Sequence, residues 1–216
     1  MQKQQINNII FDFGCVIIKA DFKVLSKKIA KTKEEEDFIY KNIFYSPEWM
    51  GLGLVDTGFL SFEALAEIIN DRTNNSHREL VNKVLSNVNS MFKYNDNILE
   101  LIRELKKKGY NLYMLSNISK KVYSTFRDDL KDLFDGLVLS YEIHKIKPYD
   151  GIYNYLIDKY NINPEQSLFI DDNEDNINAS KKFNIISEKV HKNDLDDVKR
   201  VLKKWGCLWK NLKNMY

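Results

Sequence analysis

Short apolar runs recur along this chain, and polar or turn-forming residues follow each of them. Five runs stand out: Asn8–Phe11, Leu112–Leu115, Leu137–Leu139, Ser167–Ile170 and, more weakly, Ile185–Val190. Segments with the period of an α-helix lie between the later runs, including Ile98–Lys108, which Gly109 closes, and Gly151–Tyr160. Strands that alternate with helices of this length build a parallel sheet through right-handed crossovers. The sequence therefore predicts an α/β fold with a Rossmann-like, doubly wound parallel sheet.

A long segment interrupts this alternation between the first run and the second. Residues 20–92 show no convincing strand, but four stretches in them have helical periods: Phe22–Ala30, Glu34–Phe44, Phe62–Asn70, which follows Ser61 as an N-cap, and Arg78–Val88. We therefore expect a small helical cap domain at residues 20–92, inserted into a core domain made of residues 1–19 and 93–216. Because open α/β sheets bind ligands beyond the carboxyl ends of their strands, this cap would lie over the binding site.

The charge balance argues against nucleic acid as a partner. The chain has 33 Lys and Arg residues against 31 Asp and Glu, a formal net charge of +2, and its basic residues are dispersed. No apolar run approaches the ~18 residues that span a bilayer, and residues 1–8 lack the apolar region of a signal peptide. We expect a cytoplasmic protein that is not embedded in a membrane.

The two cysteines, Cys15 and Cys207, are too few to build a disulfide framework or a zinc cluster, so reduced thiols are expected. A phosphatase with a cysteine nucleophile would need an arginine six positions after it, and Asp21 stands there. Cys15 is interpreted as a small residue that packs in a loop.

Chemically active side chains follow the predicted strands. They are Asp12 after the first strand, Ser116 and Asn117 after the second, Asp171 and Asp172 after the strand that begins at Ser167, and Lys147 in the segment His144–Pro148 that leads into a helix. Because the carboxyl ends of parallel strands share one edge of the sheet, these side chains would converge on one crevice. A carboxylate, a hydroxyl, an ammonium and an acidic pair in one crevice predict a functional site.

Phosphoryl transfer is the chemistry that needs this set. A phosphate dianion repels a carboxylate nucleophile, so the site needs a hard divalent cation, for which carboxylate and carbonyl oxygens are suitable ligands. Asp12, Asp172 and a backbone carbonyl could hold Mg²⁺. Ser116, the backbone amides near Asn117 and Lys147 offer donors to the phosphate oxygens. Asp12 would attack phosphorus in line, and water would hydrolyse the aspartyl phosphate.

The same stretches resemble the four motifs of the haloacid dehalogenase superfamily. "FDFGCVI" resembles the first motif, whose leading Asp is the nucleophile, and "LYMLSN", "KIKP" and "LFIDDNEDN" resemble the second, third and fourth, in the superfamily's order. The inserted helical region is similar to the superfamily's C1-type cap. The stretches "DTGFLSFEALAE" and "KPYDGIYNYLIDKYNINPEQSLFIDDNEDNINAS" extend the likeness to the branch with bacterial α-glucose-1-phosphate phosphatases and the N-terminal domain of soluble epoxide hydrolases. The resemblance reaches to about residue 195.

The resemblance implies an Mg²⁺-dependent phosphatase of a small phosphorylated metabolite, with sugar phosphates, hexose 1-phosphates included, as the class. It implies that Asp12 is the nucleophile and a metal ligand, that Gly14 binds the metal through its carbonyl, and that Asp172 is a further metal ligand. Asp171 would contact the metal through a bound water. Phosphate would be bound by Ser116, Asn117 and Lys147, and Lys147 would also have a catalytic part.

Some of these residues have plainer explanations. Ser116 is also placed to cap the next helix, and Lys147 to be a solvated loop lysine. Lys145 lies farther from the proline that ends the third motif, which favours Lys147. Asp175 and Asn176 are interpreted as residues that cap or brace the helix after the acidic pair. The histidines lack a second ligand at useful spacing and are interpreted as loop or surface residues.

Gly14 is a departure from the superfamily pattern. Its phosphatases commonly carry a second Asp at this position, where it protonates the leaving oxygen and then activates water. General acid–base help is worth about 10²–10⁴-fold in rate. The substrate is then an activated ester, such as an anomeric sugar phosphate, with an acid borrowed from the cap. Alternatively, the protein binds a phosphorylated ligand with little turnover, or it catalyses another phosphoryl transfer such as a phosphomutase reaction. A third alternative is a 2-haloacid dehalogenase, but the pair Asp171–Asp172 argues against it.

Two further segments each have more than one interpretation. Trp49–Val55 is aromatic, apolar and rich in glycine, which suits either a surface that stacks on a sugar or packing inside the cap. The tail Val198–Leu212 has an apolar stripe opposite basic residues, interrupted by Gly206. It is expected to cover one face of the sheet, to form a subunit contact, or to lie on a membrane surface. Either a monomer or a homodimer is expected.

Overall fold

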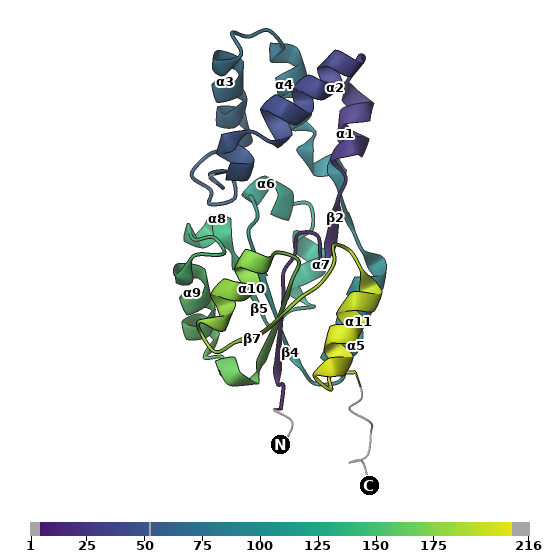
Figure 1. Ribbon diagram of the computed structural model, residues 1–216, viewed down its shortest axis with the longest axis vertical. Coiled ribbons are helices and arrows are strands. Elements are labelled where there is room, and N and C mark those ends of the chain that lie inside the picture. The colour runs from purple at the N-terminus through teal and green to yellow at the C-terminus, as the bar shows by residue number, and fades with distance from the viewer. Residues whose placement is uncertain (1–4, 52, 209–216) are drawn as a thin grey trace.

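A computed structural model describes residues 5–51 and 53–208 and shows a parallel sheet with helices on both faces (Figure 1). The strands are β1 (Asn8–Phe11), β4 (Asn111–Ser116), β5 (Gly136–Leu139), β6 (Ser167–Asp171) and β7 (Ile186–Lys189), in the order β5-β4-β1-β6-β7. Every neighbouring pair in this sheet is parallel. The predicted fold class is confirmed, and each apolar run matches a strand to within one residue at either end.

Side chains alternate along the strands and give the sheet two apolar faces. On one face, Ile9 and Phe11 belong to the same buried cluster as side chains of α5 (Asp96–Lys107) and α11 (Leu195–Lys204). On the other face, Ile10 shares a cluster with side chains of α9 (Asp150–Tyr160) and α10 (Glu174–Lys181). Burial on both faces explains why the strands appear in the sequence as continuous apolar runs.

Short elements complete this part of the molecule: α6 (Lys120–Tyr123), α7 (Arg127–Lys131), α8 (Ser140–Ile143) and the 3₁₀ turn Pro164–Gln166. The tail follows the first of its three interpretations, because Val198, Val201 and Leu202 of α11 are buried against the sheet. Trp209 and Leu212 lie outside the described residues. Across the described part of the chain, no helix has both the length and the apolar character needed to cross a membrane.

Residues 22–91 form a group of helices beyond the carboxyl ends of the strands (Figure 1). The elements are α1 (Phe22–Ile29), α2 (Lys33–Ile39), α3 (Phe62–Arg72), α4 (Arg78–Ser86), π-helical turns at Tyr40–Phe44 and Pro47–Gly51, and a 3₁₀ turn at Val88–Met91. Ser61 caps α3 as predicted, since its Oγ accepts the Ala64 N–H at 3.1 Å. We call residues 22–91 the helical lobe and the remainder the sheet lobe.

The buried side chains of the helical lobe continue into the apolar cluster that covers one face of the sheet. Trp49 is buried there and packs edge-to-face against Phe62, with ring centroids 5.2 Å apart, and against Phe44 at 6.2 Å. Of the two interpretations of the segment Trp49–Val55, the structure therefore supports internal packing for the tryptophan. Leu52 lies outside the described residues.

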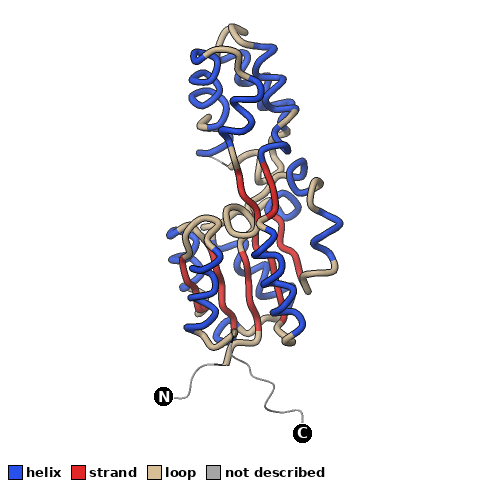
Figure 2. The backbone as a smooth tube through the Cα atoms, turned by 90° about the vertical axis from the view of Figure 1, so that its right-hand side faces the viewer, coloured by secondary structure: helices blue, strands red, loops and turns tan. Residues whose placement is uncertain are grey.

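An antiparallel pair of strands joins the two lobes, and Figure 2 shows it running between the sheet and the helices. β2 (Ile18–Ala20) pairs with β3 (Phe92–Tyr94) in a register that places Ile18 opposite Tyr94. The prediction that residues 20–92 contain no strand was wrong at both ends of that range. Each strand has only three residues with a lysine at its centre, which is too short for a period-2 pattern to be recognised.

Candidate active site

Three carboxylates meet at the carboxyl end of the sheet. Asp12 directly follows β1, Asp171 ends β6, and Asp172 is the next residue. β1 and β6 are neighbours, and the Asp12 N–H donates to the Ile170 carbonyl oxygen at 2.9 Å, so the strand pairing itself brings the acids together. One oxygen from each carboxylate lies within 4.8 Å of the other two. The structure thus brings together the acids that the sequence placed at the strand ends.

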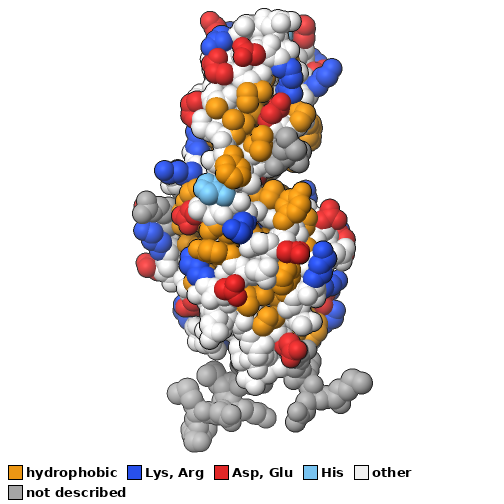
Figure 3. Space-filling model, turned by 90° about the vertical axis from the view of Figure 1, so that its left-hand side faces the viewer, with side chains coloured by type: hydrophobic (Ala, Val, Ile, Leu, Met, Phe, Trp, Pro, Cys, Tyr) orange, Lys and Arg blue, Asp and Glu red, His pale blue; other side chains and the backbone are white. Residues whose placement is uncertain are grey.

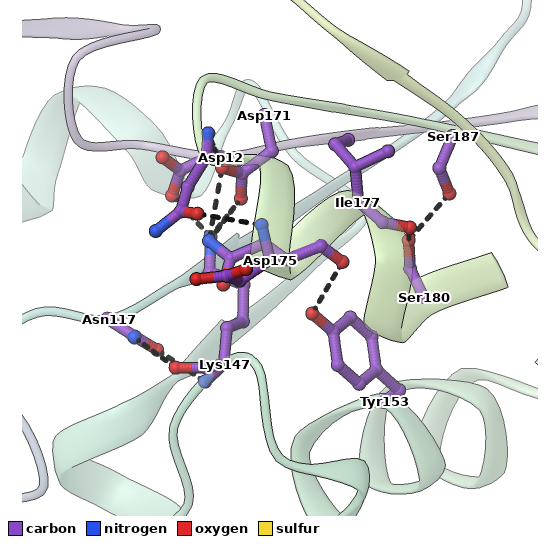
Figure 4. A network of polar contacts seen from close by, with 11 residues as sticks. Asp12, Asn117, Lys147, Tyr153, Asp171, Asp175, Ile177, Ser180 and Ser187 are labelled. Carbon is purple, nitrogen blue, oxygen red and sulfur yellow. Dashed lines mark hydrogen bonds and ion pairs between the residues drawn. The ribbon is translucent and has the colours of Figure 1, made fainter. Parts of the chain in front are cut away.

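Lys147 lies between two of these acids, as Figure 4 shows. Its Nζ donates to Asp12 Oδ1 at 2.6 Å and to Asp171 Oδ2 at 2.7 Å, and only 3% of the residue is exposed. Burial lowers the pKa of Lys147, but the two carboxylates outweigh it and hold that pKa above its usual range. Lys145 is exposed. The structure therefore brings Lys147, and not Lys145, to the carboxylates.

The positive charge near the three carboxylates does not balance their negative charge. Burial raises the pKa of Asp12 from 3.8 to about 8; Lys147 opposes this shift, and Asp171 and Asp172 reinforce it. Burial and the charge of Asp171 likewise raise the pKa of Asp172. Lys192, which is exposed, approaches Asp172 only to 3.8 Å. Three carboxylates around one buried ammonium favour the binding of a cation.

Asp171 is held more firmly than the other two acids. Its Oδ1 accepts the Asn173 N–H at 2.8 Å, and the Asn176 Nδ2 donates to both of its oxygens, at 3.1 and 2.9 Å. With Lys147 on Oδ2 as well, most of its lone pairs are used. Asp12 and Asp172 therefore have more oxygen capacity left for a ligand than Asp171 has.

The helix after the acidic pair is capped by Asn173, whose Oδ1 accepts the Asp175 N–H at 2.9 Å. The interpretation of Asp175 as a cap was wrong, because Asn173, two residues after the end of β6, already fills that place. Asn176 has the bracing role that the sequence suggested, since its amide fixes the Asp171 carboxylate. Its own carbonyl accepts the Tyr153 hydroxyl at 3.0 Å (Figure 4).

Ser116 is fully buried at the end of β4, and its Oγ has no hydrogen-bond partner within the described ranges. It does not cap the next helix, because Ser119 does so by accepting the Val122 N–H at 3.3 Å. A buried polar group without a partner costs about 1–3 kcal/mol. A ligand with acceptor oxygens, such as phosphate, would satisfy this hydroxyl.

Asn117 has a part that sequence reasoning missed. Its Nδ2 donates to the Lys147 carbonyl oxygen at 2.8 Å, and its Oδ1 accepts the Lys147 N–H at the same distance. The side chain therefore positions the lysine, and only the backbone of Asn117 is left to offer a donor to phosphate. Nothing in a single sequence links these residues, which are 30 positions apart.

The chain turns sharply after Asp12, with the Phe13 carbonyl accepting the N–H groups of Ile17 and Ile18 at 3.0 and 2.9 Å. Cys15 lies in this turn with φ of 59°, and burial raises the pKa of its thiol to about 11. The thiol is thus protonated at neutral pH, which agrees with a packing residue rather than a nucleophile. A Cβ added to Gly14 would meet no described atom within 4 Å, so the position has room for a side chain.

Comparison with known proteins gives a family and several relatives. The family described as haloacid dehalogenase-like hydrolase matches residues 9–190. The chain is 28% identical over 196 residues to a D-ribitol-5-phosphate phosphatase of Bacteroides thetaiotaomicron, a match that covers 82% of this chain and 88% of that protein.

Solved structures of low sequence identity share the fold. A HAD-like family hydrolase of Porphyromonas gingivalis is similar with a TM-score of 0.71 at 20% identity, covering 92% of this chain and 98% of that chain. A HAD family enzyme of Bacteroides thetaiotaomicron, in complex with magnesium and inorganic phosphate, is similar with a TM-score of 0.66 at 23% identity, covering 88% and 96%. Both likenesses extend over nearly the whole chain.

Proposed function

Because the chain belongs to the haloacid dehalogenase-like hydrolases, we propose that it is an Mg²⁺-dependent phosphomonoester hydrolase of a small phosphorylated metabolite. The observation that carries the proposal is the buried group of Asp12, Asp171, Asp172 and Lys147 beside the unpaired Ser116 hydroxyl. The relative that is named as a phosphatase of D-ribitol 5-phosphate supports a sugar or sugar-alcohol phosphate as substrate, a class that includes hexose 1-phosphates. We place the enzyme in the cytoplasm, as a monomer or homodimer.

The acid group fits Mg²⁺. Oxygen ligands about 2.1 Å from an octahedral Mg²⁺ lie about 3 to 4 Å from one another. One oxygen from each of the three carboxylates of this site lies within 4.8 Å of the other two. The ion would be held by Asp12, Asp172 and the Gly14 carbonyl, and Asp171 would contact it through a bound water. When bound, Mg²⁺ supplies the positive charge that offsets the repulsion between the phosphate and Asp12.

The side chains of the site have distinct parts in this reaction. Asp12 attacks phosphorus in line, an Asp–O–P bond forms, and the bond from phosphorus to the alcohol oxygen breaks. Lys147 holds Asp12 in place and, with the Ser116 hydroxyl, balances charge on the phosphoryl oxygens. Water then hydrolyses the acyl phosphate, which releases inorganic phosphate and restores Asp12. Residues 20–92, which include the helical lobe, form a cap domain that excludes bulk water.

Metal removal is the first test of this proposal. We expect phosphate release from p-nitrophenyl phosphate and from a panel of sugar and sugar-alcohol phosphates, and a fall of at least about 100-fold with EDTA. Re-addition of Mg²⁺ restores the rate, which separates metal loss from denaturation. Absence of Mg²⁺-dependent release from every phosphomonoester would overturn the proposal, and metal-independent chloride release from 2-chloropropionate would identify a dehalogenase instead.

Gly14 leads to a second prediction. The variant Gly14→Asp is expected to raise kcat about 10-fold or more for alkyl phosphates, whose alkoxide leaving groups need a proton, because it supplies an acid where an added Cβ meets no described atom within 4 Å. The matched variant Gly14→Ala fills the same space without an acid and should leave the rate unchanged. The comparison is made on butyl phosphate and on p-nitrophenyl phosphate, whose leaving group needs little protonation. Equal rates for the two variants on butyl phosphate would show that an acid at this position has no effect.

The missing acid also favours a second candidate function, a protein that binds a phosphorylated ligand with little turnover. Such a protein would be stabilised by its ligand in the presence of Mg²⁺ without releasing phosphate, since a ligand bound only to the folded state raises the melting temperature. Parallel thermal-shift and phosphate-release measurements on the same panel separate the two functions.

A further inference from the structure

The loop at residues 53–60 reaches from the helical lobe onto α8 of the sheet lobe, below α3 in Figure 1. The Ser140 hydroxyl contacts the Asp56 carbonyl oxygen, and the His144 ring nitrogen Nδ1 contacts the Thr57 carbonyl oxygen at 2.8 Å. Phe59 stacks on His144 with ring centroids 4.9 Å apart, and Figure 3 shows a histidine among hydrophobic side chains where the lobes meet. These contacts hold the loop against the sheet lobe.

The same serine connects this loop to the loop after β4. Ser140 Oγ accepts the Ile118 N–H at 2.8 Å, and Ile118 lies two positions after Ser116, the serine with the unpaired hydroxyl. One hydroxyl group therefore bridges the backbone of Asp56 and the segment that we propose to bind phosphate. Asp56 is a neighbour of the candidate site although 44 positions separate it from Asp12 in the sequence.

Asp56 carries an unused carboxylate. The residue is partly buried, and burial raises the pKa of its carboxyl from 3.8 to about 7. None of the residues described by the structure pairs with its carboxylate through a hydrogen bond or an ion pair. A desolvated acid without a partner is costly to the fold, and such groups are concentrated at binding and catalytic sites.

The surroundings of Asp56 place it away from the phosphate. Asp171 and Asp172 both raise the pKa of Asp12, whereas burial alone raises that of Asp56. Asp56 therefore belongs to the loop of the helical lobe and not to the acid group of Asp12, Asp171 and Asp172. A ligand whose phosphate is held by the sheet lobe would present its far end to this loop.

We propose that Asp56 accepts hydrogen bonds from hydroxyl groups of the substrate carbon chain at the end distant from the phosphate, so that the enzyme selects polyhydroxylated phosphomonoesters. This inference rests on the proposed function and deepens it, since it assigns a residue to the recognition of the organic part of the substrate. A carboxylate accepts hydrogen bonds from two neighbouring hydroxyls at once and repels a second anionic group. The site is accordingly selective against bisphosphates and phosphorylated carboxylic acids.

The test compares Asp56→Ala and Asp56→Asn with wild type on D-ribitol 5-phosphate, butyl phosphate and p-nitrophenyl phosphate. Ribitol 5-phosphate and butyl phosphate both release an alkoxide, but only the former has hydroxyls for Asp56. We expect Asp56→Ala to lower kcat/KM for ribitol 5-phosphate by about 10- to 100-fold, chiefly through KM, and to change the other two by less than about twofold. Asp56→Asn, which keeps one acceptor oxygen, should lose less. Asp71→Asn, at an exposed acid of α3, is the matched control and should behave as wild type.

Other outcomes overturn the inference. A fall in kcat for both alkoxide esters with p-nitrophenyl phosphate spared would make Asp56 a proton donor, and an equal fall for all three esters would make it a support of the loop. No change for ribitol 5-phosphate would remove it from recognition. Calorimetry tests the inference even if the wild type releases no phosphate. It compares the binding of ribitol 5-phosphate and of butyl phosphate, in the presence of Mg²⁺, to Asp12→Asn and to the double variant Asp12→Asn with Asp56→Ala.

Discussion

The variant Asp12→Asn is expected to lose at least about 10⁴ in kcat on every phosphomonoester that the wild type hydrolyses. The amide oxygen of Asn is a poor nucleophile, and no acyl phosphate can form on it and be hydrolysed in the ordinary cycle. Rates of phosphate release under single-turnover conditions measure the loss. Asp175→Asn, at an exposed acid on the helix after the acidic pair, is the control and should keep its rate.

The same variant should be more stable than wild type without Mg²⁺. In the folded protein burial raises the pKa of Asp12 from 3.8 to about 8, so the folded state binds a proton that the unfolded chain has released between those pH values. Ionisation of Asp12 therefore costs stability, which falls as the pH rises through this window. Asn cannot ionise, and the gain in melting temperature should be larger at pH 8 than at pH 5. Retained turnover in Asp12→Asn would remove Asp12 as the nucleophile, and an equal gain at both pH values would contradict the electrostatic explanation.

Removal of the ammonium should have the largest effect on stability. Lys147→Met is expected to lower the free energy of unfolding by about 3–5 kcal/mol at pH 8, because a buried ion pair loses one partner and two acids stay behind. The carboxylates hold the pKa of Lys147 above its usual 10.5, so the wild type keeps the full contribution of this lysine throughout the neutral range and loses it only at strongly alkaline pH.

The loss in Lys147→Met should be smaller at pH 5, where Asp12 carries a proton and less charge is left unbalanced. Urea denaturation at the two pH values, without Mg²⁺, measures the difference. Lys145→Met is the matched control, because that lysine is exposed and lies in the same segment. If the two variants lost equal stability, the buried pairs of Lys147 would have no special weight in this fold.

The sheet was predictable because its strands are covered on both sides. Strand β1 is buried at every position, and such a strand appears in the sequence as an unbroken apolar run with sharp ends. The strands β2 and β3 depend instead on pairing with each other, and a three-residue strand leaves no pattern of its own. The sequence therefore predicts elements that are stabilised by burial better than those stabilised by a partner strand.

The same distinction holds in the candidate site. Asp12 and Asp171 were predicted to converge because the ends of neighbouring parallel strands share an edge, which is a rule of topology. The clamp of Asn117 on the Lys147 backbone and the approach of the 53–60 loop to Ser140 depend on side-chain contacts across the fold. No local spacing encodes such contacts, and Asp56 in "LVDTG" has the appearance of an ordinary turn acid.

The strands that join the lobes also bear on how such a protein can change. Ala20 pairs with Phe92, and the Asp21 N–H donates to the Met91 carbonyl oxygen at 2.8 Å, so the chain leaves the sheet lobe and returns to it at one point. A two-residue hairpin turn closes strands at this separation. The helical lobe is thus an insert whose length and sequence can change without moving β1 or α5, which belong to the sheet lobe. A change in the helical lobe can therefore alter which substrate is recognised while the reacting groups of the sheet lobe stay in place.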